Sequence, residues 1–244
     1  MPHMSKETIT VAWCDNGMVD GKFAEGLVYT VLTAAFNGIP VVNAMRVQGN
    51  QIGRQRQVLF DMWYDQGKTD WLMWVDSDIV LTTDVFKLIW NTADKHSRPV
   101  VTGTYFISKQ TESSLMQPMP ALFNETGKEF EIQYIHPLPE PSVIKVDCAG
   151  MGLALMHRSI VPILREKFPN QSMFAEQEGL GEQYVGEDIV FFRKLKAAGI
   201  PVHAHTGATV KHMKRFAYDE NYYRLYWHAA KAAEAQSGDT TSEQ

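Results

Sequence analysis

The chain has 244 residues, 45% of them hydrophobic and 21% charged, which is ordinary for a globular protein of one large α/β domain or two small ones. The net charge is −5 and no long basic run occurs, so the composition argues against nucleic-acid binding, which needs clustered Lys and Arg. Two cysteines exclude a disulfide framework or a zinc cluster, and without a membrane-length apolar stretch or a signal-peptide pattern we expect a cytoplasmic protein.

Strands and helices alternate through the first half of the sequence. Short β-rich or apolar runs predict strands at residues 8–13, 40–47, 71–75 and 99–106. Apolar residues at helical spacing predict helices from Phe23 to about Asn37, over residues 50–66, and from an N-cap at Thr82 to Thr92. This repeated alternation predicts an α/β fold with a mostly parallel central sheet and helices on both faces.

The middle of the chain departs from this alternation. Residues 107–146 contain five prolines and a hairpin-like stretch around Asn124–Gly127, which predicts a small antiparallel excursion. Beyond it we expect strands at 143–147, 152–156, 200–205 and 208–210, helices at 158–168, 186–199 and 219–235, and a loop at 171–185. No repeat or linker is evident, so we expect one domain over residues 5–236 and a disordered polar tail over 237–244.

Asp76-Ser77-Asp78 directly follows the apolar run Trp71–Val75. Such a run indicates a strand buried on both faces, and carboxylates two positions apart leave its end on the same side. Ligands of open α/β sheets bind at the carboxyl ends of the strands. Two neighbouring carboxylates repel each other, so a divalent cation is an economical explanation. The structural alternative is a polar strand end in which Asp78 caps a turn.

Several common nucleotide and hydrolase motifs are missing. No G-x-G-x-x-G follows the first strand, no G-x-x-x-x-G-K-[ST] occurs, and there is no G-x-S-x-G. The sequence therefore argues against a nicotinamide oxidoreductase, a P-loop NTPase and an α/β-hydrolase.

Four pieces of sequence, in order, resemble the nucleotide-sugar-dependent glycosyltransferases of the GT-A fold. They are the helical segment Arg54–Leu59, the pair Asp76 and Asp78, which resembles the DxD motif, the acidic segment Gly186-Glu187-Asp188, and His212. The resemblance covers about residues 8–215. The resemblance implies a single-domain, Rossmann-like GT-A fold, Mn²⁺ or Mg²⁺, a nucleotide-sugar donor of the UDP type, and a carbohydrate or other hydroxyl acceptor.

The resemblance also implies roles for these residues. Asp76, Asp78 and His212 would hold the metal, Asp78 most directly, with Asp76 reaching the ribose or the metal. Asp188 would be the general base of an inverting enzyme, with Glu187 as a hydrogen-bonding helper, or would orient the acceptor in a retaining one. Both acidic residues also have a structural reading, because carboxylates stabilise the first turn of a helix.

The donor nucleotide would contact a second group of residues. The resemblance places the nucleoside at the end of the first strand and phosphates near basic side chains, which gives Ala12, Trp13, Asp15, Arg56 and Lys214. Arg56 is followed by Gln57 where the family has Asn. Both residues also have a structural interpretation. Trp13 could pack in the core, and Arg56 could be a solvated helix residue.

Two other functions stay open on the sequence alone. A nucleotidyltransferase uses a related sheet and aspartate pair, but it usually has a Gly- and Lys/Arg-rich loop after the first strand, and residues 15–22 contain one Lys. A non-catalytic carbohydrate-binding protein would use a flat aromatic patch, for which the cluster Tyr222–Trp227 is the candidate.

Overall fold

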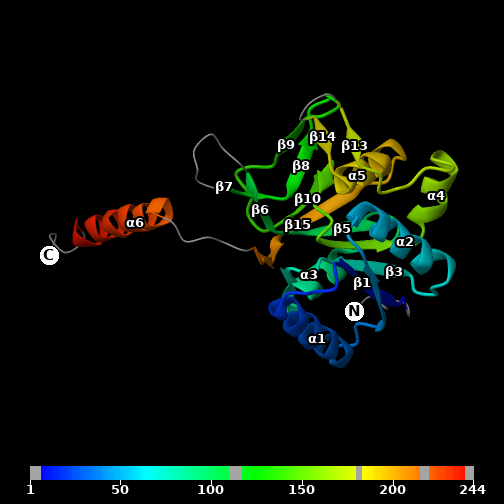
Figure 1. Cartoon of the computed structure of the whole chain (residues 1–244). Coiled ribbons are helices and arrows are strands. Elements are labelled where there is room, and N and C mark those ends of the chain that lie inside the picture. The colour runs from blue at the N-terminus through cyan, green and yellow to red at the C-terminus, as the bar shows by residue number, and fades with distance from the viewer. Residues whose placement is uncertain (1–6, 110–116, 180–182, 215–219, 240–244) are drawn as a thin grey trace. The chain divides into compact units, whose positions relative to one another are not determined.

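The computed structural model describes residues 7–109, 117–179, 183–214 and 220–239 (Figure 1). The chain divides into two compact units, one of residues 1–107 with 120–213 and one of residues 108–119 with 214–244. The single domain expected over residues 5–236 stays a prediction. None of the described helices is long and apolar enough to cross a membrane.

A seven-stranded sheet forms the centre of the larger unit, in the order β10-β15-β5-β12-β3-β1-β2. β1 pairs in parallel with β2 and β3, and β15 with β5, whereas β12 and β10 run antiparallel to their neighbours. The mostly parallel α/β sheet is therefore confirmed. The strand bounds are β1 (Ile9–Asp15), β2 (Val41–Gln48), β3 (Trp71–Val75), β5 (Val100–Thr104), β10 (Val143–Val146), β12 (Leu153–His157) and β15 (Val202–Thr209).

Helices cover both faces of this sheet, as the alternation predicts (Figure 1). α1 and α3 contact each other on one face, and α2 and α5 contact each other on the other. Asp20 caps α1 through its side chain, and Thr82 caps α3 as expected. The helix bounds are α1 (Gly21–Phe36), α2 (Ile52–Asp65), α3 (Thr83–Thr92), α4 (Ile160–Lys167) and α5 (Glu187–Ala197).

The core forms where the sequence is continuously apolar. Every residue of β3 and of β12 is buried, because these central strands have neighbours on both edges and covered faces. Trp63, Trp71 and Trp74 are among the largest fully buried side chains. Asp76 and Asp78 thus directly follow a rigid, closely packed strand.

The remaining strands of the larger unit are short. β8 (Leu122–Glu125), β9 (Ile132–Tyr134) and β11 (Cys148–Ala149) form the expected antiparallel excursion. β13 (Gln177–Glu178) pairs with β14 (Tyr184–Val185) inside the segment expected to be a loop. β4 (Ile79–Val80) pairs antiparallel with β16 (Lys211–His212), a ladder that the sequence does not reveal. The two strands expected over 200–210 are the single strand β15.

The smaller unit contains the second half of β6 (Phe106–Lys109), most of β7 (Gln117–Pro120), which pairs with β6, and the helix α6 (Glu220–Asp239). The helix predicted over residues 219–235 is present, and it continues into the segment predicted to be a tail. Residues 240–244 of that tail lie outside the described residues.

Candidate active site

Arg56 joins two elements at the carboxyl end of the sheet. It lies on the buried face of α2 and is 4% exposed. Its Nη2 donates to both carboxylate oxygens of Asp76, at 2.9 and 3.0 Å, and its Nη1 donates to Oε1 of Glu187. One guanidinium therefore connects the end of β3 to the first turn of α5 through charge-assisted hydrogen bonds.

Gly53 lets α5 approach α2 closely enough for that connection. A Cβ at Gly53 would lie 2.4 Å from the carbonyl oxygen of Phe174 and 3.2 Å from Cβ of Glu187. Because the two helices lie this close, the Arg56 side chain, one turn further along α2, reaches Glu187. The packing of two helices thus sets the position of a charged group.

Asp78 and His212 meet across the β4–β16 ladder. His212 is paired with Ile79, and the Met213 N–H donates to the Asp78 carbonyl at 2.7 Å. Nε2 of His212 lies 3.2 Å from Oδ2 of Asp78, while its Nδ1 lies 2.9 Å from the carbonyl oxygen of Phe106. In the tautomer that donates from Nδ1 to this carbonyl, the Nε2 lone pair faces the aspartate.

This Asp78–His212 pair suits a divalent cation. A carboxylate oxygen and an imidazole nitrogen form a donor set that Mn²⁺ accepts, and an anchored Nδ1–H is the usual support of a ligating imidazole. Within the described ranges, no group of three or more His, Cys, Asp or Glu side chains could hold a metal ion. The Asp76 carboxylate is instead bonded to Arg56, so its role as a direct ligand stays a prediction.

Asp188 lies in the first turn of α5 beside Glu187. One of its carboxylate oxygens accepts from the Ile189 N–H at 2.8 Å. Burial raises the pKa of Asp188 and that of Glu187, although Arg56 opposes both shifts. Burial lowers the pKa of the Arg56 guanidinium, but the carboxylates of Asp76 and Glu187 outweigh this effect and raise it. Arg56 is thus a permanent cation among acidic groups.

Tyr105 is a site residue that the sequence did not single out. Its hydroxyl accepts from the Gly152 N–H at 3.2 Å, and its ring meets that of His212 edge-on at 5.0 Å. A Cβ at Gly150 would lie 2.0 Å from the Tyr105 hydroxyl, and one at Gly152 would lie 3.1 Å from Oδ2 of Asp76. Gly150 and Gly152 thus mark the segment that Tyr105 and Asp76 approach closely.

The residues expected to bind the nucleoside lie at the end of β1. Ala12 is fully buried, and Trp13 packs against Phe23 with ring centroids 5.8 Å apart. Asp15 forms a bidentate ion pair with Arg46 and accepts a hydrogen bond from Trp13 Nε1 at 3.1 Å. The carboxylate of Asp15 thus stabilises the fold, and its contact with a nucleotide stays a prediction.

Most of the expected residues therefore fall into three groups, and Asp188 lies beside Glu187 of the first group in the first turn of α5. Arg56, Asp76 and Glu187 are bonded together, Asp78 and His212 lie with Oδ2 and Nε2 3.2 Å apart, and Ala12, Trp13 and Asp15 lie along β1. Lys214 belongs to the smaller unit, so it is not placed relative to the others.

Comparison with known proteins gives a likeness of fold. Neither the protein-family models nor the curated proteins yield a match. Among solved structures, A197 from STIV matches with a TM-score of 0.52 and 20% identity, covering 85% of this chain and 86% of its own. GalNAc-T7 with UDP, GalNAc and Mn²⁺ has a TM-score of 0.47 at 9% identity, over 90% of this chain and 47% of that one. A glycosyltransferase involved in the glycosylation of the major capsid of PBCV-1 has a TM-score of 0.33 at 13% identity, over 66% and 69%. The likeness to A197 establishes the fold alone, and the two lower scores carry no argument about function.

Proposed function

We propose that the protein is a metal-dependent glycosyltransferase that transfers a sugar from a nucleoside-diphosphate donor, of the UDP type, to an acceptor hydroxyl. The observation that carries the proposal is the Asp78–His212 pair, anchored through Phe106, at the carboxyl end of β3. Such an end is where open α/β sheets bind ligands. The order of motifs along the sequence supports the same reaction class.

Acidic side chains gather at the site and support a bound cation. Asp76, Asp78, Glu187 and Asp188 bring four carboxylates to the ends of β3 and α5, and Arg56 is bonded to Asp76 and Glu187. Asp78 and His212 would hold Mn²⁺ or Mg²⁺, with the donor diphosphate and water as further oxygen ligands. The ion would supply charge stabilisation for the departing diphosphate.

The protein groups then have separate tasks. Asp188 accepts the proton of the acceptor hydroxyl while that oxygen bonds to the anomeric carbon of the donor sugar. The bond between this carbon and the diphosphate oxygen breaks, and its electron pair leaves with the nucleoside diphosphate. Arg56 fixes Asp76 and Glu187 in place, so that the acidic groups need no reorganisation during transfer.

Product analysis tests the proposal. Purified protein would be incubated with a panel of nucleotide sugars, with and without Mn²⁺, and the released nucleotide identified. We expect a nucleoside diphosphate, released only with metal, and a loss of about two to three orders of magnitude in Asp78→Asn. Asp84→Asn, an exposed aspartate in the first turn of α3, is the matched control and should retain activity.

Two results would contradict the proposal. In a parallel incubation with nucleoside triphosphates and sugar phosphates, release of pyrophosphate would support the nucleotidyltransferase instead. Full transferase activity in the presence of a chelator would separate the Asp78–His212 pair from the reaction.

A further inference from the structure

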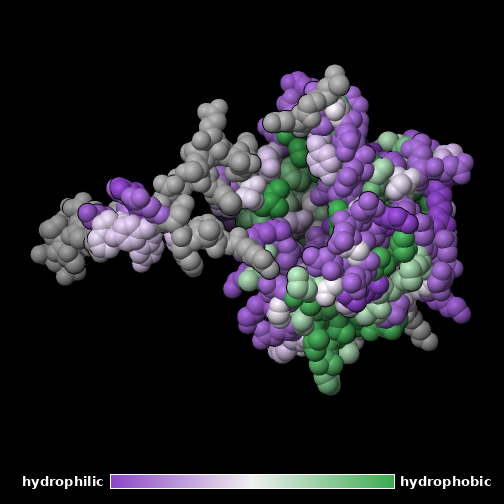
Figure 2. Space-filling model, in the orientation of Figure 1, coloured by the Kyte–Doolittle hydropathy of each residue, from purple (hydrophilic) through white to green (hydrophobic). Residues whose placement is uncertain are grey.

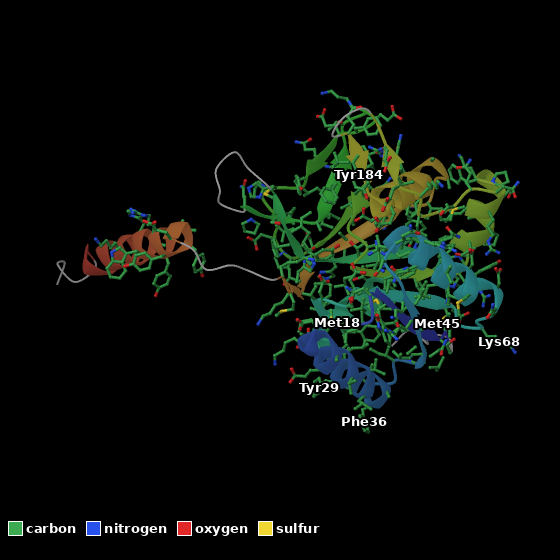
Figure 3. The ribbon with its side chains drawn as sticks, viewed as in Figure 1. Met18, Tyr29, Phe36, Met45, Lys68 and Tyr184 are labelled. Atoms are coloured by element: carbon green, nitrogen blue, oxygen red, sulfur yellow. The ribbon has the colours of Figure 1, made fainter. Side chains whose placement is uncertain are left out.

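An uncharged apolar surface covers the outer side of α1 and the start of β2. Between Gly26 and Met45 the sequence contains no Asp, Glu, Lys, Arg or His. Five large side chains there are exposed: Val28, Tyr29, Leu32 and Phe36 on α1, and Val42 on β2. We call these five residues the α1 patch. Figure 2 shows a green area around α1, and Figure 3 shows Tyr29 and Phe36 pointing away from the body of the unit.

The α1 patch contains both a projection and a hollow. Phe36 is 91% exposed at the last turn of α1. Beside it a groove of about 460 Å³ runs between α1 and β2, lined by Leu27, Val28, Leu32, Val42 and Ala44 among others. Asn43 is the one polar residue in its lining. A single face thus offers an aromatic side chain and a hollow large enough to receive one.

We propose that the α1 patch is the interface of a two-fold symmetric dimer of this chain. In a two-fold contact the same surface appears on both sides, so Phe36 of each copy can enter the groove of the other. An uncharged patch meets its own copy without like-charge repulsion. The proposal concerns assembly and does not depend on the reaction.

The area of the α1 patch is sufficient for such a dimer. Exposed side chains of these sizes offer roughly 100–150 Å² each, or roughly 1,000–1,500 Å² from the five residues of two copies. Backbone and groove atoms add to this, and stable interfaces begin at about 1,200 Å² in total. Monomeric proteins rarely expose contiguous apolar patches larger than a few hundred Å².

The free edge of the sheet adjoins the α1 patch. β2 is the terminal strand of the seven-stranded sheet among the described strands. The β1–β2 register shifts between Ile9 and Thr10, opposite Val42, and such an irregularity discourages continuous pairing along an edge. We therefore assign the contact to side chains of α1 and Val42 and not to a continued ladder.

A lipid surface fits the α1 patch less well. Helices that lie on membranes carry Lys or Arg beside their apolar face. On α1 the exposed lysine is Lys22, and its ammonium group is paired with Glu25 at 2.7 Å. With a net charge of −5 the chain as a whole is repelled by anionic lipid.

Sedimentation velocity of the full chain tests the proposal. We expect a dimer at about 10 µM, and at least a tenfold weaker association in Phe36→Glu and in Leu32→Glu. Ile163→Glu, at an exposed apolar position of α4, should remain dimeric. All three positions are exposed, so circular dichroism should show unchanged folding.

A cysteine cross-link adds a positional readout. Cys14 and Cys148 are buried, so Leu32→Cys on oxidation should give a covalent dimer on a non-reducing gel, whereas Ile163→Cys should not. A wild-type monomer at about 100 µM would overturn the proposal, as would a dimer that Phe36→Glu leaves intact. Binding of a monomer to phosphatidylcholine vesicles, lost in Phe36→Glu, would instead assign the patch to a lipid surface.

Discussion

Arg56 is buried with two of its nitrogens bonded to carboxylates on different elements. Removing one partner of a buried ion pair leaves an uncompensated charge, and this costs more than the pair itself contributes. Arg54, two residues earlier on α2, is exposed, so the same residue type has two different environments within one helical turn.

This contrast gives a stability prediction. Arg56→Met should lower the free energy of unfolding by about 3 kcal/mol, because Asp76 and Glu187 would lose their shared cation. Arg54→Met should change it by less than about 0.5 kcal/mol. Urea denaturation of both variants measures the difference, and equal losses would show that the buried network is not what stabilises this region.

Asp188 gives a prediction about pH. Burial raises its pKa above that of an exposed aspartate, so the proton-accepting form is lost at a higher pH as the solution is acidified. We expect kcat/KM to fall as pH drops, with a midpoint clearly above the usual value of about 3.9 for aspartate. Asp188→Asn should abolish transfer. Constant activity of the wild type down to pH about 4 would contradict the role of Asp188 as base.

At the level of elements, the sequence predicted the helices and strands whose pattern extends over several residues. The apolar run of β3, the Thr82 cap and the helical spacing of α2 are local signals, and each predicted its element. β4 and β16 have two residues each, and their pairing joins segments about 130 positions apart, so no local pattern encodes it. Yet this ladder brings His212 to Asp78. The motif residues could be named from the sequence, whereas Tyr105 and the Arg56 ion pairs depend on tertiary packing.

The contact between α2 and α5 yields a prediction for a glycine. Gly53→Ala would place a Cβ 2.4 Å from the backbone oxygen of Phe174, which cannot move without shifting its segment. We expect a loss of about 1–3 kcal/mol in the free energy of unfolding and weaker activity, because α5 carries Glu187 and Asp188. Gly21→Ala is the control, since a Cβ there meets nothing within 4 Å. Thermal unfolding of both variants checks this, and equal melting temperatures would contradict close packing at Gly53.

At the level of the whole molecule, the net charge of −5 and the carboxylates at the end of the sheet both favour the binding of a cation. A cation that binds the folded chain and not the unfolded chain raises the free energy of unfolding by RT ln(1 + [L]/Kd), or about 2.7 kcal/mol at 100 Kd. For a chain of this size each kcal/mol corresponds to roughly 2–4 °C in Tm.

Mn²⁺ alone should therefore raise the melting temperature of the wild type by about 5–10 °C at saturation, without any nucleotide. Asp78→Asn and His212→Ala should lose most of this shift, because each removes one of the two paired donors. Asp84→Asn should keep it. The shift is read by differential scanning fluorimetry at several Mn²⁺ concentrations. An equal shift in all four proteins would place the cation elsewhere on the acidic surface, and the Asp78–His212 pair would then be an ordinary hydrogen-bonded contact between β16 and the end of β3.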